Sequence, residues 1–230
     1  YMAYSLDLKG SEYYTIYLRN LSSNKNEKDL IENTSGNVTW ALDSKSFFYS
    51  KLDKFHRPRK IYQHILGTKI ENDILIFEEK DERFTCSIDT TSCEKYYTIE
   101  TSEHTTSETY YFHKDEKKFE PKLVLKREDG ILYSLDSFDG YWYIHTNKDA
   151  EDFKILRCPN DKMNDWKDFV PAKSGTLIGG LTFLKKWIIR SEISNALSKV
   201  LVRNIETGTE EELILSDEKV ISPGISLMQK

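Results

Sequence analysis

The sequence has 230 residues, of which 38% are hydrophobic and 13% aromatic, so it can bury a substantial core. Its net charge is −5, with acidic and basic residues mixed along the chain, which argues against a nucleic-acid-binding surface. No run of about 18 apolar residues is present, which argues against a membrane-spanning helix. Residues 1–10 also lack the basic and apolar regions of a signal peptide. We therefore expect a cytoplasmic protein that binds neither nucleic acid nor membrane.

The first segment, residues 1–33, is expected to contain three strands, at residues 1–6, 13–20 and 28–32. Its tripeptide ending at Asp7 is a near-copy of a later one ending at Asp43, but the two lie only 43 − 7 = 36 residues apart, fewer than the repeat described below. The first strand is therefore better interpreted as the second strand of a repeat unit. We expect the chain to begin inside such a unit.

The second segment, residues 34–80, shows most clearly the unit from which the chain is built. Its third strand, KIYQHIL, alternates apolar and polar residues, the period of a half-buried strand. A basic loop at residues 53–59 precedes that strand. Four antiparallel strands of such lengths make one blade of a β-propeller, and here they are expected at residues 38–42, 46–52, 60–66 and 73–77.

Three further segments repeat this pattern, at residues 81–128, 129–172 and 173–216, and residues 217–230 are expected to begin another. Near the end of the fourth segment, residues 164–171 fit either an outer strand or a short helical turn. In the fifth, the pair Gly179-Gly180 is expected to form a bulge or bend within a strand.

The third strands of the five segments carry the repeat. Their equivalent positions are separated by 45, 48, 46 and 45 residues, as the differences 61 − 16, 109 − 61, 155 − 109 and 200 − 155 give. An aspartate predicted in the first turn also recurs, at Asp43, Asp89 and Asp136. A period in the mid-forties is typical of four-stranded propeller blades. We predict an all-β fold over residues 1–230: a single, incomplete β-propeller domain of four-stranded antiparallel blades. The equivalent positions are Ile16, Ile61, Thr109, Ile155 and Val200.

No catalytic motif is visible. The sequence has no G-x-S-x-G nucleophile elbow, P-loop, G-x-G-x-x-G or H-E-x-x-H. His64, His113 and His145 are expected on strands with no second histidine nearby, which favours cross-strand or surface roles over metal ligation or base catalysis. The acidic run at residues 78–82 is expected to form a solvated face. On residues alone, a binding or gating role is the default.

The three cysteines, Cys86, Cys93 and Cys158, are an odd number without metal-binding spacing. Cys86 and Cys93 flank a predicted turn and could approach each other, but a cytosolic chain would keep them reduced. We predict free thiols, no metal site and no cofactor.

Three stretches, WALDSKSFFY, KIYQHILGT and ILIFEEKDERFTCSIDTTSCEKYYTIETSEHTTSET, resemble the N-terminal propeller of the prolyl oligopeptidase family of serine peptidases. Within that family the sequence is most similar to oligopeptidase B, also called protease II. The resemblance covers nearly the whole chain and agrees with the repeat count.

The resemblance implies a seven-bladed propeller that caps an α/β-hydrolase domain, of which this chain would supply about five blades. The catalytic Ser, Asp and His of the family lie in the hydrolase domain, and the propeller admits oligopeptides while excluding folded proteins. Oligopeptidase B-like members cleave after Lys or Arg. None of the catalytic positions falls on this sequence, so we expect the chain alone to be inactive. Alternatives are a free-standing propeller that binds a peptide or protein, and a non-functional fragment of a split gene.

Four residues are candidates for gating substrate or contacting the hydrolase domain. Asp53, Arg57 and Arg59 lie in the basic loop between the second and third strands of a blade, and such loops share one face of a propeller. Arg57 and Arg59 could form ion pairs that hold the two domains closed. Phe48, on the second strand, could either face the cavity that the propeller shares with the hydrolase domain or pack between blades.

Overall fold

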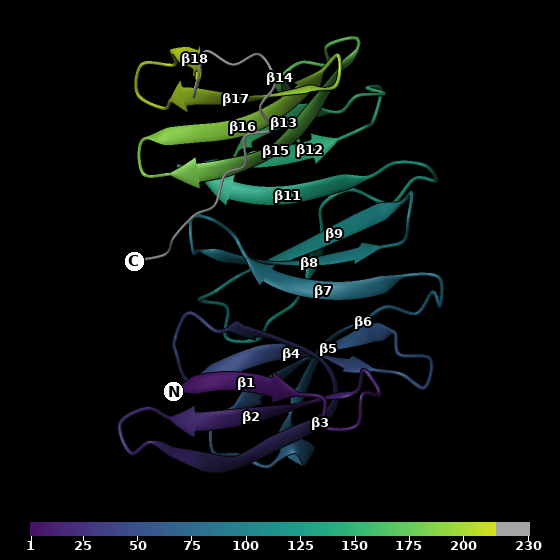
Figure 1. Ribbon diagram of the computed structural model, residues 1–230, viewed down its shortest axis with the longest axis vertical. Helices are drawn as coiled ribbons and strands as arrows, with labels where there is room; N and C mark the ends of the chain where they lie inside the picture. The colour runs from purple at the N-terminus through teal and green to yellow at the C-terminus, as the bar shows by residue number, and fades with distance from the viewer. Residues whose placement is uncertain (215–230) are drawn as a thin grey trace. The chain divides into compact units, whose positions relative to one another are not determined.

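The computed structural model describes residues 1–214, and the strand expected within residues 217–230 lies outside them. The described chain forms β-strands and turns, with a single turn of 3₁₀ helix, η1, at Ile70–Asn72 (Figure 1). In this part of the chain no helix is long and apolar enough to cross a membrane. The chain divides into two compact units, Tyr1–Gly130 and Ile131–Lys230. The prediction of an all-β fold built from antiparallel sheets is confirmed.

The N-terminal unit contains two antiparallel sheets, one of six strands and one of four. The six-stranded sheet follows chain order and comprises β1 (Met2–Leu6), β2 (Tyr14–Asn20), β3 (Lys25–Trp40), β4 (Ser46–Leu52), β5 (Pro58–Ile65) and β6 (Ile74–Glu78). The four-stranded sheet comprises β7 (Thr85–Thr90), β8 (Tyr96–Ser102), β9 (Ser107–His113) and β10 (Lys122–Leu123).

Strand β3 corrects one prediction. Separate strands were expected at residues 28–32 and 38–42, but a single strand runs through the first and into the second, ending at Trp40. Its first half pairs with β2 and its second half with β4, and its pairing with β4 shifts register between Thr34 and Val38. Gly36 lies within this shift at φ +85°, and a Cβ there would lie 2.9 Å from Cγ of Tyr14. The continuous strand therefore changes its partner from β2 to β4 across the sequence Asn-Thr-Ser-Gly, with a local irregularity at Gly36.

The repeat positions of the third strands are confirmed as structurally equivalent. Each lies on the strand expected, β2, β5, β9, β13 or β17, and each is at most 2% exposed. The recurring aspartate behaves differently. Asp43 lies in the turn after β3, whereas Asp89 and Asp136 lie inside strands and the turns follow them. The aspartate repeat therefore marks the end of the first strand as well as its turn.

Two apolar clusters form the core of the N-terminal unit. One lies against β2, β3 and β4 and contains Ile16, Leu18, Ile31, Phe47 and Tyr49. The other joins the two sheets, because Phe48 and Ile61 from the first sheet pack with Tyr97, Ile99 and Phe112 from the second. Strand β8 shows why the two sheets pack together, because every second residue along it is buried. Packing of one sheet against the next is what a propeller blade requires.

The C-terminal unit contains two four-stranded antiparallel sheets. Tyr143 and Ile155 of the first sheet pack with Ile178, Phe183 and Ile188 of the second. Residues 167–170 form an outer strand, so the strand alternative is confirmed over the helical turn. The expected bulge is also confirmed, because the pairing shifts between Ile178 and Leu181, across the glycine pair. The strands are β11 (Tyr133–Phe138), β12 (Tyr141–Thr146), β13 (Lys154–Pro159), β14 (Lys167–Val170), β15 (Thr176–Leu184), β16 (Trp187–Ser194), β17 (Leu197–Asn204) and β18 (Glu210–Glu212).

Candidate functional site

The basic loop between β4 and β5 is organised by Asp53. One carboxylate oxygen accepts hydrogen bonds from the backbone N–H groups of Phe55 at 2.8 Å and Arg57 at 3.1 Å. The other accepts one from Nε of Arg59 at 3.1 Å. Partial burial of Asp53 would raise its pKa, but these hydrogen bonds and the charge of Arg59 outweigh that effect and lower it. The carboxylate is thus held ionised and shapes the loop.

Arg57 and Arg59 both contact the connection between β6 and β7. Nη1 of Arg57 donates a hydrogen bond to the backbone oxygen of Glu82. Nη2 of Arg59 lies 3.8 Å from a carboxylate oxygen of Glu82, in addition to its contact with Asp53. The structure therefore brings Asp53, Arg57 and Arg59 together. Arg57 stays exposed, whereas the Arg59 side chain is only 20% exposed.

Phe48 lies apart from these three residues. Its side chain is 0% exposed and forms edge-to-face contacts with Tyr97, Phe112 and Phe119, with ring centroids 4.9, 5.9 and 5.7 Å away. Of the two alternatives for Phe48, this packing corresponds to the one between blades, where the ring stabilises the core.

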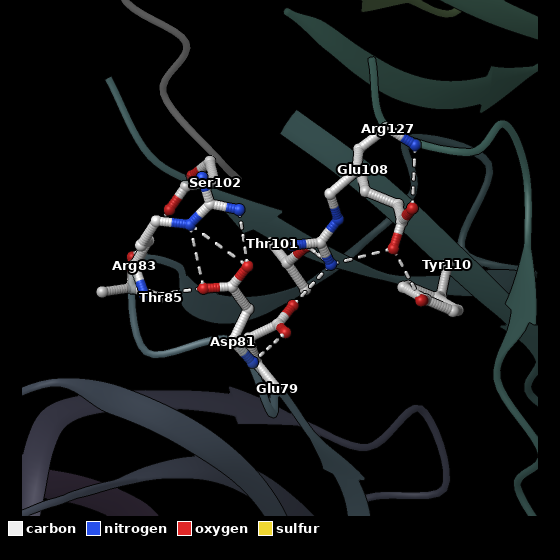
Figure 2. A network of polar contacts seen from close by, with 9 residues as sticks. All are labelled: Glu79, Asp81, Arg83, Thr85, Thr101, Ser102, Glu108, Tyr110 and Arg127. Carbon is white, nitrogen blue, oxygen red and sulfur yellow. Dashed lines mark hydrogen bonds and ion pairs between the residues drawn. The ribbon is translucent and has the colours of Figure 1, made fainter. Parts of the chain in front are cut away.

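A network of charges that the sequence did not suggest lies nearby, centred on Arg127 (Figure 2). Nη2 of Arg127 lies 2.6 Å from Glu79 and 2.9 Å from Glu108, and it also donates to the hydroxyl of Thr101 at 3.2 Å. The guanidinium carbon lies 4.0 Å from the ring centroid of Phe84. One arginine thus ties together the end of β6, strands β8 and β9, and the segment that leaves β10.

Both glutamates of the network are buried. Burial would raise the pKa of Glu108, but the hydrogen bonds from Arg127 and Tyr110 outweigh it and lower that pKa. The hydroxyl of Tyr110 lies 2.7 Å from Oε1 of Glu108. Two buried carboxylates therefore depend on one guanidinium for charge compensation.

Beside this network, Asp81 and Arg83 form an exposed pair at 2.8 Å (Figure 2). The side-chain hydrogen bond from Arg83 is the main cause that lowers the pKa of Asp81 to about 2. The prediction of a solvated acidic face at residues 78–82 is therefore wrong for Glu79, which is buried against Arg127.

The burial of Glu108 could have been found from the strand pattern. Strand β9 reads SETYYFH, so Glu108, Tyr110 and Phe112 share one face, and the aromatic residues place that face against the core. A glutamate there needs a cation. Nothing in the sequence indicates that Arg127, 19 residues further on, supplies it.

Five connecting segments of the N-terminal unit are linked by side-chain contacts, and we call them the loop side. Nε2 of His56 lies 2.9 Å from the backbone oxygen of Ser11, and the two arginines of the basic loop reach Glu82. Arg127 reaches Glu79, and Thr106 accepts a hydrogen bond from the backbone of Gly130 at 3.1 Å. The loop side is thus a connected surface, made of residues 7–13, 53–57, 79–84, 103–106 and 124–130.

A groove of about 400 Å³ in the same unit lies between strands β3, β4 and β7. Its lining includes Asn37, Thr39, Ser50 and Asp89. Thr39 and Ser50 already donate hydrogen bonds to the backbone oxygens of β7, at 2.9 and 3.5 Å. The groove mixes polar and apolar side chains and carries no set of residues arranged for catalysis.

His64, His113 and His145 lie on strands as expected, but two of them are more deeply buried than a surface role implies. His64 lies between Asp29 and Asp73, and His145 stacks on Phe153 with its Nε2 2.7 Å from the backbone oxygen of Ile178. Over residues 1–214, no three His, Cys, Asp or Glu side chains are placed to hold a metal ion. All three cysteines are free thiols, as predicted.

Comparison with known proteins identifies the family. The model of the prolyl oligopeptidase N-terminal β-propeller domain matches residues 1–229. Protease 2 from Moraxella lacunata is 35% identical over 160 residues, which are 69% of this chain and 23% of that protein. Dipeptidyl aminopeptidase BI from Pseudoxanthomonas mexicana is 28% identical over 232 residues, which are 98% of this chain and 31% of that protein.

Solved structures agree with this assignment. Oligopeptidase B from Leishmania major superimposes with a TM-score of 0.86 at 20% identity, covering 94% of this chain and 32% of that one. Oligopeptidase B from Trypanosoma brucei, with covalently bound antipain in a closed form, gives 0.84 at 24% identity, covering 95% and 32%. At such identities the likeness concerns the fold. The chain spans about a third or less of the length of these relatives. Because the family model covers residues 1–229, the chain belongs to the prolyl oligopeptidase family and represents its N-terminal β-propeller domain.

Proposed function

We propose that this chain is the propeller portion of an oligopeptidase B-like serine peptidase, in which it covers a catalytic α/β-hydrolase domain and restricts access to oligopeptides. The observation that carries the proposal is the family match over residues 1–229, together with relatives about three times as long. Cleavage after Lys or Arg and a cytoplasmic location are parts of the same proposal. Three free thiols are in keeping with a reducing compartment.

The loop side is the surface that we propose to face the catalytic domain. Its segments are held together by these contacts. Binding of the catalytic domain would therefore require little loss of loop entropy. Phe55 is 58% exposed, with Nζ of Lys54 4.9 Å from its ring centroid and the Arg57 guanidinium 6.0 Å away. An exposed aromatic ring beside an exposed arginine is the composition typical of interface anchors.

This arrangement sharpens the expectation for the two arginines. Arg59 is largely covered and already paired with Asp53, so its first role is to hold the loop. Arg57 uses one nitrogen on a backbone oxygen and stays exposed. We therefore propose Arg57 for the contact with the catalytic domain, with Asp53 and Arg59 positioning it.

The experiment uses the protein in which this propeller is followed by its catalytic domain. Its kcat/KM is measured on a short peptide with a single arginine and on a folded protein with exposed arginines. We expect serine-reagent-sensitive cleavage of the peptide and none of the folded protein. Arg57→Ala and Arg59→Ala should lower peptide kcat/KM or loosen domain closure in small-angle scattering.

Arg19→Ala is the matched control, because Arg19 lies in the β2–β3 hairpin and its side chain bonds only to Asn24 and Asn26 in the N-terminal unit. It should leave both measurements unchanged. If Arg57→Ala and Arg59→Ala also left them unchanged, the proposed domain contact would be wrong. If no serine-dependent peptide cleavage were found, the peptidase assignment itself would be wrong.

A further inference from the structure

His64 is the most completely enclosed charged group of the N-terminal unit. It lies on β5 with its side chain 0% exposed, between the carboxylates of Asp29 and Asp73, which are 8% and 2% exposed. Nδ1 lies 2.8 Å from Oδ1 of Asp73 and Nε2 lies 3.3 Å from Oδ2 of Asp29. Both ring nitrogens therefore face an acceptor.

This geometry requires the charged form of the ring. A neutral imidazole has one N–H donor and one lone pair, whereas the imidazolium has two donors. In the neutral form one nitrogen lone pair would point at a carboxylate oxygen. Two buried carboxylates would then lack a compensating positive charge, an arrangement that is strongly unfavourable away from water.

Among the described residues, His64 is the only cation in contact with the carboxylates of Asp29 and Asp73. Tyr49 from β4 donates its hydroxyl to Oδ2 of Asp73 at 2.8 Å, and the backbone N–H of Gly67 donates to Oδ2 of Asp29 at 2.8 Å. Both are neutral donors. Asp29 also lines an outer groove, together with Lys28, Lys69 and Glu71. In the described part of the chain, neither lysine forms an ion pair with Asp29 or Asp73.

The three residues join strands β3 and β5 of the six-stranded sheet, which do not pair directly with one another. Asp29 lies on the first half of β3, which pairs with β2, whereas His64 and Asp73 belong to β5 and the residue before β6. Asp29 also holds the turn after β5 through Gly67. The contact therefore fastens the outer strand of the first blade to the third and fourth strands of the second.

We propose that His64 is a proton-operated latch, whose protonated ring holds the outer edges of the first two blades together and whose deprotonation releases them. The groups that face it are Asp29 from β3, Asp73 before β6 and, through Asp73, Tyr49 from β4. Phe47, whose ring centroid is 5.2 Å from that of His64, closes the site on the core side.

The electrostatics agree with the geometry. Burial alone would lower the pKa of His64, but the hydrogen bonds and charges of Asp73 and then Asp29 outweigh it and raise that pKa. A raised folded-state pKa means that the stabilisation is fully present below the unfolded value of about 6.5 and is lost as pH rises through the folded value. The latch is therefore closed in acid and opens towards alkaline pH.

The direct test is an NMR titration of the 230-residue chain with labelled histidine, which needs no substitution. We expect the His64 ring to stay doubly protonated well above about pH 6.5, the value of a free histidine side chain. Amide exchange at Gly67 and in the first half of β3 is measured at about pH 6 and about pH 8. After correction for the intrinsic pH dependence, exchange should be faster at the higher pH, because the stabilisation by the charged ring is lost as pH rises through the folded-state value.

Asp73→Asn removes one carboxylate and should bring the His64 titration down towards the free value and abolish the pH dependence of exchange at Gly67. His113→Gln is the matched control, because Nδ1 of His113 lies 3.6 Å from Asp115 at the surface, and it should change neither measurement. A His64 ring that is neutral at about pH 6, or exchange at Gly67 with no pH dependence beyond the intrinsic one, would overturn the proposal.

Discussion

Each of the two units contains an arginine held by two glutamates, half-buried in the case of Arg127 and buried in the case of Arg190, and the two networks differ in what they connect. In the N-terminal unit Arg127 contacts Glu79 and Glu108, which are 48 and 19 residues away and lie at the end of one sheet and on a strand of the next. In the C-terminal unit Arg190 contacts Glu192, two residues away on the same strand β16, and Glu210 on β18 of the same sheet.

The two networks also differ in their supply of positive charge. Lys173 adds a second cation to the C-terminal network, since its Nζ lies 2.8 Å from Oε1 of Glu192. Arg83 bonds to Asp81 instead, so Arg127 alone compensates Glu79 and Glu108 among the described residues. The two networks therefore contain similar groups but connect different parts of the fold. Arg127 joins segments that no backbone pairing joins, whereas Arg190 reinforces strands already in one sheet.

The largest effect is expected from Arg127→Ala. The substitution leaves two buried carboxylates without a cation and removes the contact with Phe84, so the free energy of unfolding should fall by about 3–5 kcal/mol. Urea denaturation of the chain measures it. Arg83→Ala is the matched control, because the Arg83 side chain is 72% exposed and its solvent-screened pair with Asp81 should contribute little to stability.

A smaller loss is expected from Arg190→Ala. Lys173 stays beside Glu192, and β16 and β17 keep their backbone pairing, so the loss should be about 1–3 kcal/mol. The same urea denaturation, run in parallel, compares the two variants. If Arg190→Ala cost more than Arg127→Ala, the distinction between a network that joins segments and one that reinforces a sheet would be wrong.

The smallest effect is expected from His145, whose pKa is shifted in the opposite direction to that of His64. Burial lowers the pKa of His145 more than its hydrogen bond to Ile178 raises it. A lowered folded-state pKa means that stability is present above the unfolded value of about 6.5 and is lost as pH falls through the folded value. His145→Gln removes this titration, so the variant should lose less stability than the natural chain between about pH 7 and about pH 5.

The expected difference is the smallest of the three effects, because it comes from the titration of one partly buried histidine. Urea denaturation at both pH values measures it. His104→Gln, at an exposed position, is the control and should leave the pH dependence as it is. A His145→Gln variant that loses as much stability in acid as the natural chain would show that His145 is not buried in its neutral form.

Periodicity in the sequence was enough to predict the strands, because alternation and aromatic content report on burial within a few residues. The buried third-strand positions such as Ile61 and Ile155 follow from it. The continuous strand β3 did not follow, since Asn33 and Gly36 take left-handed backbone conformations that a strand can absorb as well as a turn can. Whether such residues end a strand depends on the partner strands on both sides.

The candidate site was predictable only in part, because its contacts join residues far apart in the chain. The basic loop was visible from its charge, and its internal contacts from Asp53 to Arg59 are short-range. Arg127 with Glu79, and His64 with Asp29, are pairs of distant residues whose meeting depends on how the sheets pack. No sequence spacing predicts that these residues meet. The acidic run at residues 78–82 alone therefore led to the prediction that Glu79 lies on a solvated face.

We propose that this chain controls access to a peptidase and that the chemistry of hydrolysis lies outside it. The most direct measurement incubates the purified 230-residue chain with fluorogenic peptides cleaved after arginine or after proline. Acyl transfer needs a nucleophile, a base and an oxyanion hole, so we predict no turnover above the blank. Turnover that is abolished by a serine-directed inhibitor would contradict the account.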